Sequence, residues 1–141
     1  MFWGEYTHHL DSKGRLIVPS RFRPHLTGAI LTRGLDENLV LYAQETWRKV
    51  VDQLNQMPIT NPTSRALRRL LFSGAVELEL DKQGRVLIPP HLRDYAHLQE
   101  SVLLVGMETF IEVWHPKLWQ DALQNVQKTL SSEGHLLKLA L

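Results

Sequence analysis

An internal repeat constrains this chain more than any other feature of its sequence. GEYTHHLDSKGRLIVPSRFR, at residues 4–23, aligns without a gap over GAVELELDKQGRVLIPPHLR, at residues 74–93, with seven identities in twenty positions. After two additional residues in the second copy, LTRGLDENLVLYAQETW at 31–47 aligns with LLVGMETFIEVWHPKLW at 103–119. Two copies are too few for a solenoid, whose units stack in longer arrays. The sequence therefore predicts a duplicated half-domain whose copies pair about a pseudo-two-fold axis.

Each copy carries the same series of predicted elements. A half-buried strand is followed by a tight turn, and a second strand ends at a proline, which cannot donate to a ladder. A short helix, a second hairpin and an amphipathic closing helix complete the copy. The predicted elements of the first copy are the strand 6–10, turn 11–14, strand 15–18, helix 20–26, hairpin 30–33 with 39–42, and helix 44–54. Those of the second copy are 76–80, 81–84, 85–88, 90–96, 102–105 with 110–114, and 116–129.

The segment between the copies predicts a connecting helix. Asn61 is a favourable N-cap, and Pro62 suits the first helical position because its fixed φ is already helical. We therefore expect four parts along the chain. They are a first half at 1–54, a connecting helix at 55–73, a second half at 74–130, and a tail at 131–141.

The tight turns carry the candidate functional residues. Asp11 precedes Arg15 by four positions across one turn, and Asp81 precedes Arg85 in the same way across the other. This spacing lets each carboxylate orient the guanidinium or accept hydrogen bonds from the turn backbone. Glycine at the end of each turn, Gly14 and Gly84, supplies the positive φ that such a turn needs. The alternative is that each pair is an exposed salt bridge that only holds its turn.

The tips of the turns suit contact with DNA. The first tip is Ser12-Lys13 and the second is Lys82-Gln83. A rigid hairpin tip can enter a DNA groove, where arginine and lysine meet phosphates or guanine edges, glutamine reads adenine, and serine takes either role. Two tips related by a pseudo-two-fold axis would present two such loops side by side.

Charge is distributed unevenly between the two halves. The chain has a net charge of only +1, but residues 1–70 carry ten lysines and arginines against six acidic residues. Residues 71–141 carry six against nine. We expect an anionic partner to bind the first half more strongly than the second. The alternative is that the asymmetry reflects only an unevenly charged, solvated surface.

Several functional classes find no support in the sequence. The chain has no cysteine, and His8 and His9 should point to opposite faces of a strand, so we predict no metal site and no cofactor. Phosphate loops, nucleophile elbows and metal-binding His/Glu patterns are also missing, so we predict no catalytic residues and no enzyme. A His–Asp pair assembled only by folding is the alternative. Without a signal peptide or an apolar membrane span, we expect a cytoplasmic protein that does not bind membranes.

The turn motif resembles that of a known superfamily. Asp-x-x-Gly-Arg followed by apolar residues and proline is similar to the motif of the AbrB/SpoVT/MazE swapped-hairpin DNA-binding barrels. Two such motifs in tandem, in MFWGEYTHHLDSKGRLIVPSRFR and LFSGAVELELDKQGRVLIPPHLR, with LTRGLDENLVLY between them, resemble the MraZ family over about residues 1–130. The resemblance implies an α+β, mainly β fold. Its expected form is a pseudo-two-fold double-β barrel of the swapped-hairpin type, built from two tandem repeats with flanking helices.

The resemblance also implies a function. Proteins of this family resemble sequence-specific transcriptional regulators that repress their own cell-division and cell-wall gene cluster by binding direct repeats in promoter DNA. They associate with the nucleoid and form ring-like homo-oligomers. The implied DNA contacts are Arg15 and Lys13 first, Arg85 and Lys82 as their pseudo-symmetric counterparts, and Ser12 and Gln83 as adjusters. The residues that would support the turns are Asp11, Gly14, Asp81 and Gly84. The two aspartates should orient the arginines and not meet the DNA, because a bare carboxylate is repelled by phosphate.

Two expectations qualify this interpretation. The first hairpin should carry more of the DNA affinity, because it lies in the basic half of the chain. A protein-binding module of the antitoxin type, which shares the swapped-hairpin barrel, is the rival interpretation. Such antitoxins generally pair one barrel motif with a separate toxin-binding tail, whereas this chain has a second motif copy and a short tail.

Overall fold

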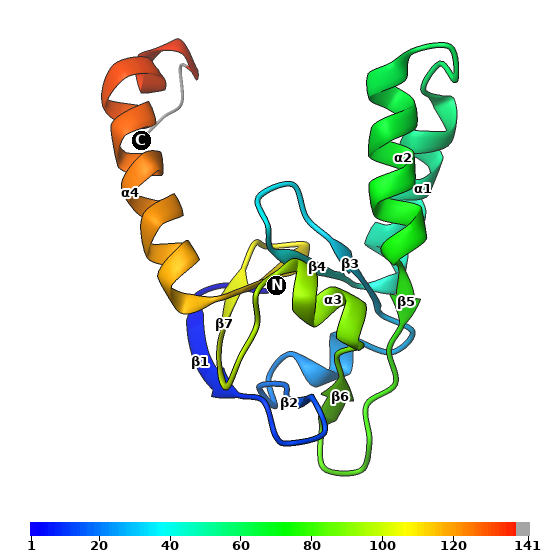
Figure 1. The fold of residues 1–141 in the computed structure, drawn as a ribbon, viewed down its shortest axis with the longest axis vertical. Coiled ribbons are helices and arrows are strands. Elements are labelled where there is room, and N and C mark those ends of the chain that lie inside the picture. The colour runs from blue at the N-terminus through cyan, green and yellow to red at the C-terminus, as the bar shows by residue number, and fades with distance from the viewer. Residues whose placement is uncertain (138–141) are drawn as a thin grey trace.

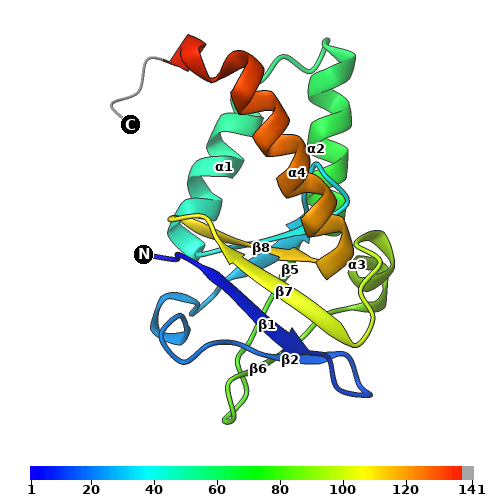
Figure 2. The same cartoon turned by 90° about the vertical axis from the view of Figure 1, so that its left-hand side faces the viewer.

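The computed structural model describes residues 1–137, which form two antiparallel sheets flanked by helices (Figures 1 and 2). One sheet has six strands in the order β1-β7-β8-β4-β3-β5, and the other pairs β2 with β6. The strands are β1 (Glu5–His9), β2 (Arg15–Ile17), β3 (Ile30–Arg33), β4 (Leu39–Tyr42), β5 (Val76–Glu77), β6 (Arg85–Leu87), β7 (Ser101–Gly106) and β8 (Phe110–Trp114). The α-helices are α1 (Gln44–Gln56), α2 (Pro62–Gly74), α3 (Pro90–Tyr95) and α4 (Pro116–Glu133). Short 3-10 helices span Arg23–His25 and Gly134–Leu137.

Strand pairing interlocks the two sequence copies. β1 pairs with β7, β2 with β6, β3 with β5, and β4 with β8, and each of these pairs joins a strand of one copy to a strand of the other. Within residues 1–137, only the hairpins β3–β4 and β7–β8 pair strands within a copy. These two hairpins confirm the second hairpin predicted for each copy. Many strand backbone groups of one copy are therefore satisfied by the other copy, which couples the folding of the two halves.

The first predicted hairpin of each copy is wrong beyond its tip. Leu10 and Leu16 form one isolated bridge across the first turn, and β1 then diverges from β2 to pair with β7. The second strands of the two predicted hairpins, β2 and β6, instead pair with each other. We call this two-stranded sheet the ribbon. The ladder continues past the ribbon strands, because Val18 N donates to Gly84 O and Ile88 N donates to Gly14 O. Each turn is thus held by a strand of the other copy.

Two further predictions need correction. The strand predicted at 76–80 is only two residues long. After the hydrogen bond from Leu78 N to Ala29 O, the chain leaves the ladder with β3 and runs toward the second turn. The helix predicted at 20–26 is reduced to the 3-10 turn at 23–25, whose Pro24 cannot sustain an α-helical ladder. The counterpart predicted at 90–96 is confirmed as α3. Among the residues described, the strands form two sheets and no closed barrel, so the predicted double barrel is not confirmed.

The longer helices lie where the sequence predicts them. Asn61 caps α2 with its side chain, which accepts hydrogen bonds from Thr63 N at 2.8 Å and Ser64 N at 3.4 Å. The closing helices extend beyond their predicted ends, to Gln56 in α1 and to Glu133 in α4. The predicted tail therefore begins inside α4, and its last residues, 138–141, lie outside the described residues. No helix within residues 1–137 combines the length and apolar character needed to cross a membrane.

The main core lies between the six-stranded sheet and the ribbon. Side chains along β7 alternate between the two faces of the sheet, so Val102 and Leu104 enter this core while Leu103 and Val105 face α4. The ribbon closes the core with four side chains that are at most 4% exposed: Leu16, Val18, Val86 and Ile88. Figures 1 and 2 show α1 with α2, and α4, rising as two arms from the other face of the sheet. The ribbon and both turns consequently lie at the end of the molecule opposite these arms.

We predict that adjacent residues of β2 contribute very differently to stability. Leu16→Ala removes a side chain that is 2% exposed at the centre of the ribbon, and it should lower the free energy of unfolding by about 2–5 kcal/mol. Ile17→Ala is the matched control, because Ile17 is 47% exposed and its loss should cost about 0.5 kcal/mol or less. Urea unfolding followed by tryptophan fluorescence measures both. Equal losses in the two variants would contradict the placement of the core beneath the ribbon.

Candidate nucleic-acid interface

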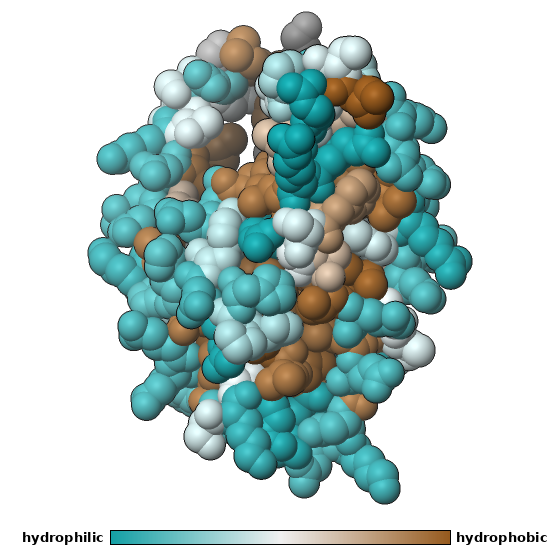
Figure 3. Space-filling model, turned by 45° about the vertical axis from the view of Figure 1, so that its right-hand side comes forward, coloured by the Kyte–Doolittle hydropathy of each residue, from teal (hydrophilic) through white to brown (hydrophobic). Residues whose placement is uncertain are grey.

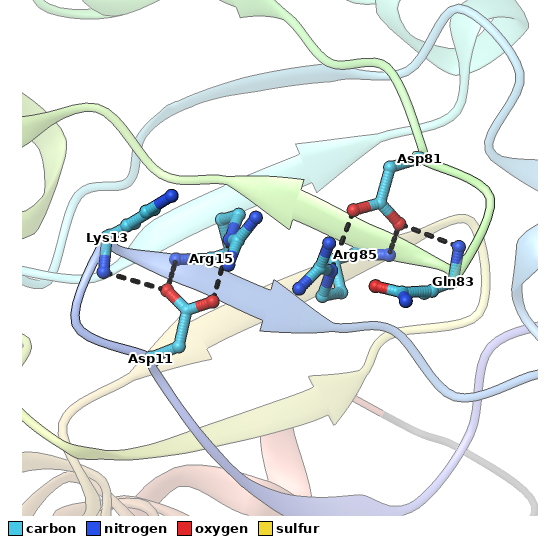
Figure 4. Close-up of polar contacts among 6 residues, drawn as sticks. All are labelled: Asp11, Lys13, Arg15, Asp81, Gln83 and Arg85. Carbon is cyan, nitrogen blue, oxygen red and sulfur yellow. Dashed lines mark hydrogen bonds and ion pairs between the residues drawn. The ribbon is translucent and has the colours of Figure 1, made fainter.

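The first turn is organised by the Asp11 carboxylate (Figure 4). Its Oδ1 accepts hydrogen bonds from Lys13 N and Arg15 N, both at 2.9 Å, and its Oδ2 accepts one from Arg15 Nε at 2.7 Å. Gly14 N donates to Asp11 O at 3.0 Å, and Gly14 adopts a φ of 80°, which glycine takes at little cost. One carboxylate thus caps the turn backbone and orients the arginine, the two actions that the sequence spacing allows.

The second turn repeats this geometry. Asp81 Oδ1 accepts from Gln83 N and Arg85 N at 2.9 Å, and Oδ2 accepts from Arg85 Nε at 2.7 Å (Figure 4). Gly84 has a φ of 77° and closes the turn. The two copies therefore build the same local structure although their tip residues differ in sequence.

Both arginines are oriented through one side of the guanidinium. In the described part of the chain, the side-chain hydrogen bonds found for Arg15 and Arg85 engage Nε only. The Nη groups are the atoms that can pair with a phosphate or with the O6 and N7 of guanine. An arginine already held at Nε loses less side-chain freedom when it binds, so the turn preorganises it for an anionic or polar ligand.

Hydrogen bonds hold both carboxylates in the ionised form. The pKa of Asp11 is lowered to about 2, chiefly by the hydrogen bond from Arg15 N, with further contributions from the Arg15 guanidinium and Lys13 N. The pKa of Asp81 is lowered by the same set of contacts, led by the hydrogen bond from Arg85 N. Both turns therefore keep their charged geometry at neutral pH.

The ribbon places the two turns at its opposite ends. β2 and β6 run antiparallel, with Arg15 opposite Leu87 and Ile17 opposite Arg85. The four predicted tip residues, Ser12, Lys13, Lys82 and Gln83, are all exposed. The structure therefore brings all the predicted contact residues to one end of the molecule, where Figure 3 shows a hydrophilic lower surface.

Arg23 and Arg93 occupy equivalent positions of the two copies, and from the sequence alone either could brace the fold or contact the DNA backbone. A Cβ on Gly14 would lie 2.7 Å from Arg93 Cζ, and a Cβ on Gly84 would lie 2.2 Å from Arg23 Cζ. Each guanidinium therefore covers the turn glycine of the other copy. Arg23 Nε donates to Val18 O at 2.9 Å, whereas Arg93 Nε is buried with no hydrogen-bond partner among residues 1–137. The sequence signal for a shared role was that the two arginines occupy equivalent positions in the repeat. The exchange of strands between the copies explains why each arginine contacts the turn glycine of the other copy.

The surroundings of the ribbon differ between its two ends. Leu87 lines a shallow surface hollow together with two acidic residues, Glu77 and Glu79. The residues at the equivalent positions of the first copy are Thr7 and His9, which carry no carboxylate. Because Leu87 lies opposite Arg15, these carboxylates stand toward the Arg15 end of the ribbon, although they belong to the acidic second half of the chain.

Residues 1–70 and residues 71–136 each match the family described as "MraZ protein, putative antitoxin-like". The chain belongs to the MraZ family. The boundary between the two matched segments, at residues 70 and 71, falls within α2, between the two copies of the repeat.

Relatives similar to this chain over most of their length share one name. The "Transcriptional regulator MraZ" of Herpetosiphon aurantiacus is 49% identical over 126 residues, which cover 89% of this chain and 88% of the relative. Proteins of the same name from Desulfitobacterium hafniense and Alkaliphilus metalliredigens are 45% and 50% identical, over 97% and 84% of this chain and 96% and 84% of their own lengths.

The depressed pKa of Asp11 predicts a pH-dependent stability. Asp11→Asn should lower the free energy of unfolding at neutral pH, because the amide cannot form the ion pair with Arg15. The pKa in the folded protein, about 2, lies below the ordinary value of 3.8, so the stabilisation is present above pH 3.8 and is lost as the pH falls through about 2. Urea unfolding at several pH values should therefore show the gap between wild type and Asp11→Asn narrowing as the pH falls.

The control for this measurement is Asp121→Asn. Asp121 forms an exposed ion pair with Lys117 on α4, at 3.2 Å, and such pairs contribute little. A gap between wild type and Asp11→Asn that stays constant down to pH 2 would contradict the proposed organisation of the turn.

Proposed function

We propose that this chain is a sequence-specific DNA-binding transcriptional regulator that contacts promoter DNA through the two turns of the ribbon. The observation that carries the proposal is the pair of equivalent turns, in each of which the arginine side chain is held by its aspartate through Nε, leaving the Nη groups for a ligand. The names of the relatives support the same function. The physical benefit of such preorganisation is a lower conformational-entropy cost of binding.

The proposed roles follow the chemistry of the tip residues. Arg15 and Lys13 make the leading contacts with phosphates or guanine edges. In the second copy, Arg85 and Lys82 make the corresponding contacts. Ser12 and Gln83 adjust the fit, and Asp11 and Asp81 orient the arginines without meeting the DNA.

We propose that the first turn carries more of the affinity. The first half of the chain is basic, whereas residues 71–141, which include the second turn, carry six lysines and arginines against nine acidic residues. Carboxylates near a phosphate backbone oppose the counterion release that drives binding. The second turn then contributes more to the fold, to register on the DNA or to specificity.

Self-association would compensate for the weak charge of one protomer. α4 exposes Leu123, Val126 and Leu130, which are spaced along one helical face, and such faces favour contacts between protein chains. We propose a ring-like homo-oligomer that presents successive turns to tandem repeats in double-stranded promoter DNA. Effective concentration would then make binding cooperative and steeply dependent on salt. Repression of its own cell-division and cell-wall gene cluster, by blocking polymerase access, would place the protein at the nucleoid.

The proposal predicts unequal effects from two equivalent substitutions. Arg15→Ala should weaken binding to the promoter region upstream of the chain's own gene by about 1–3 kcal/mol, the loss typical of one arginine–guanine contact. Arg85→Ala should weaken it less, because the second turn belongs to the acidic half of the chain, residues 71–141. Fluorescence anisotropy at fixed salt measures both, with urea unfolding as a check on folding.

If Arg15→Ala binds the promoter DNA with the affinity of the wild type, the proposed contact through the turns is wrong. A stoichiometric protein partner in a pull-down, together with no affinity for promoter DNA, would favour the antitoxin-like protein-binding module instead.

A further inference from the structure

The outer face of the ribbon exposes two aliphatic side chains that the core does not use. Alternation along each strand turns Leu16 and Val86 inward, and it turns Ile17 and Leu87 outward. Ile17 is 47% exposed and Leu87 is 52% exposed. They occupy equivalent positions of the two copies, so the ribbon carries one exposed aliphatic residue near each turn.

Each aliphatic residue lies opposite an arginine. Ile17 is the cross-strand partner of Arg85, and Leu87 is the partner of Arg15, so all four side chains project from the same face. The arginines are held at Nε by their aspartates. The outer face is therefore a small, pseudo-symmetric surface on which apolar and cationic groups alternate.

We propose that Ile17 and Leu87 contact the 5-methyl groups of thymines when the ribbon enters the major groove of DNA. This inference rests on the proposed function and adds two specificity-determining residues to it. The major groove admits a two-stranded β-ribbon, and the thymine methyl is the apolar group that a base pair presents there. Exposed aliphatic side chains beside oriented arginines match an alternation of methyl groups and guanine edges.

Charge complementarity favours DNA over a second protein chain as the occupant of this face. Lys13 and Lys82 stand at the two tips, and with Arg15 and Arg85 they give the face four cationic groups, while Glu77 and Glu79 border it beside Leu87. The aspartates beside the arginines are engaged in hydrogen bonds within their turns. A duplex supplies phosphates for the cations and methyl groups for the aliphatic residues at the same time.

The test replaces thymidine with deoxyuridine, which removes only the 5-methyl group. The probe is a duplex of the promoter region upstream of the chain's own gene, made with either base. The wild type should bind the uracil duplex more weakly, by about fourfold for each methyl group that is buried against an aliphatic side chain. The double variant Ile17→Ala/Leu87→Ala should bind both duplexes with nearly the same affinity, because it lacks the groups that sense the methyl.

Ile59→Ala is the matched control. Ile59 is 67% exposed and lies in the connection before α2, so this variant should keep the wild-type ratio between the two duplexes. Thermal unfolding checks that the double variant is folded, as the exposure of both side chains leads us to expect.

The outcomes separate this inference from the proposed function. Equal binding of both duplexes by the wild type, or an unchanged ratio in the double variant, would overturn the methyl contact while leaving the proposed function standing. An altered mass of the double variant in light scattering, with an unchanged ratio, would identify the face as a contact between copies and also overturn it. A wild type that binds neither duplex would contradict the proposed function, and the methyl contact would fall with it.

Discussion

The antiparallel pairing of β2 with β6 is the interaction on which the rest of the structure depends. It joins the two copies of the repeat, and its inner side chains, Leu16 and Val86 among them, close the core against the six-stranded sheet. The same pairing continues into each turn, through Val18 N to Gly84 O and Ile88 N to Gly14 O. This one ladder therefore links the core to both turns, and it joins the two copies together with the β1–β7, β3–β5 and β4–β8 ladders of the six-stranded sheet.

This arrangement lets a very small ribbon hold a precise site. Each turn is fixed from within by its aspartate, from one side by the ladder, and from above by an arginine of the other copy, Arg93 over Gly14 and Arg23 over Gly84. Polar groups held by several contacts at once keep their orientation without a ligand. The proposed DNA contacts are thus built on strands, while the helical arms at the far end of the molecule remain available for contacts between protomers.

Sequence reasoning predicted the elements better than their pairing. The repeat, the turns, the aspartate–arginine contacts, the N-cap at Asn61 and the closing helices depend on local signals, and the structure contains them. The exchange of strands between copies depends on long-range packing, which local patterns do not encode, so the hairpins from β1 to β2 and from β5 to β6 were predicted wrongly. The contacts of Arg23 and Arg93 with the turn glycines follow from that exchange, so the sequence left open whether these arginines brace the fold or contact DNA, and the exposed aliphatic face of the ribbon was missed.

The most direct test of the account is amide hydrogen exchange of the whole chain with and without promoter DNA. The account predicts that DNA slows exchange in the two turns and along the ribbon, at residues 11–17 and 81–87, with the larger effect in the first turn. Amides of α1 and α2, at the opposite end of the molecule, should change little if the DNA meets only the ribbon. Slower exchange confined to the helical arms, with the turns unchanged, would contradict the central claim that the paired turns form the DNA-binding surface.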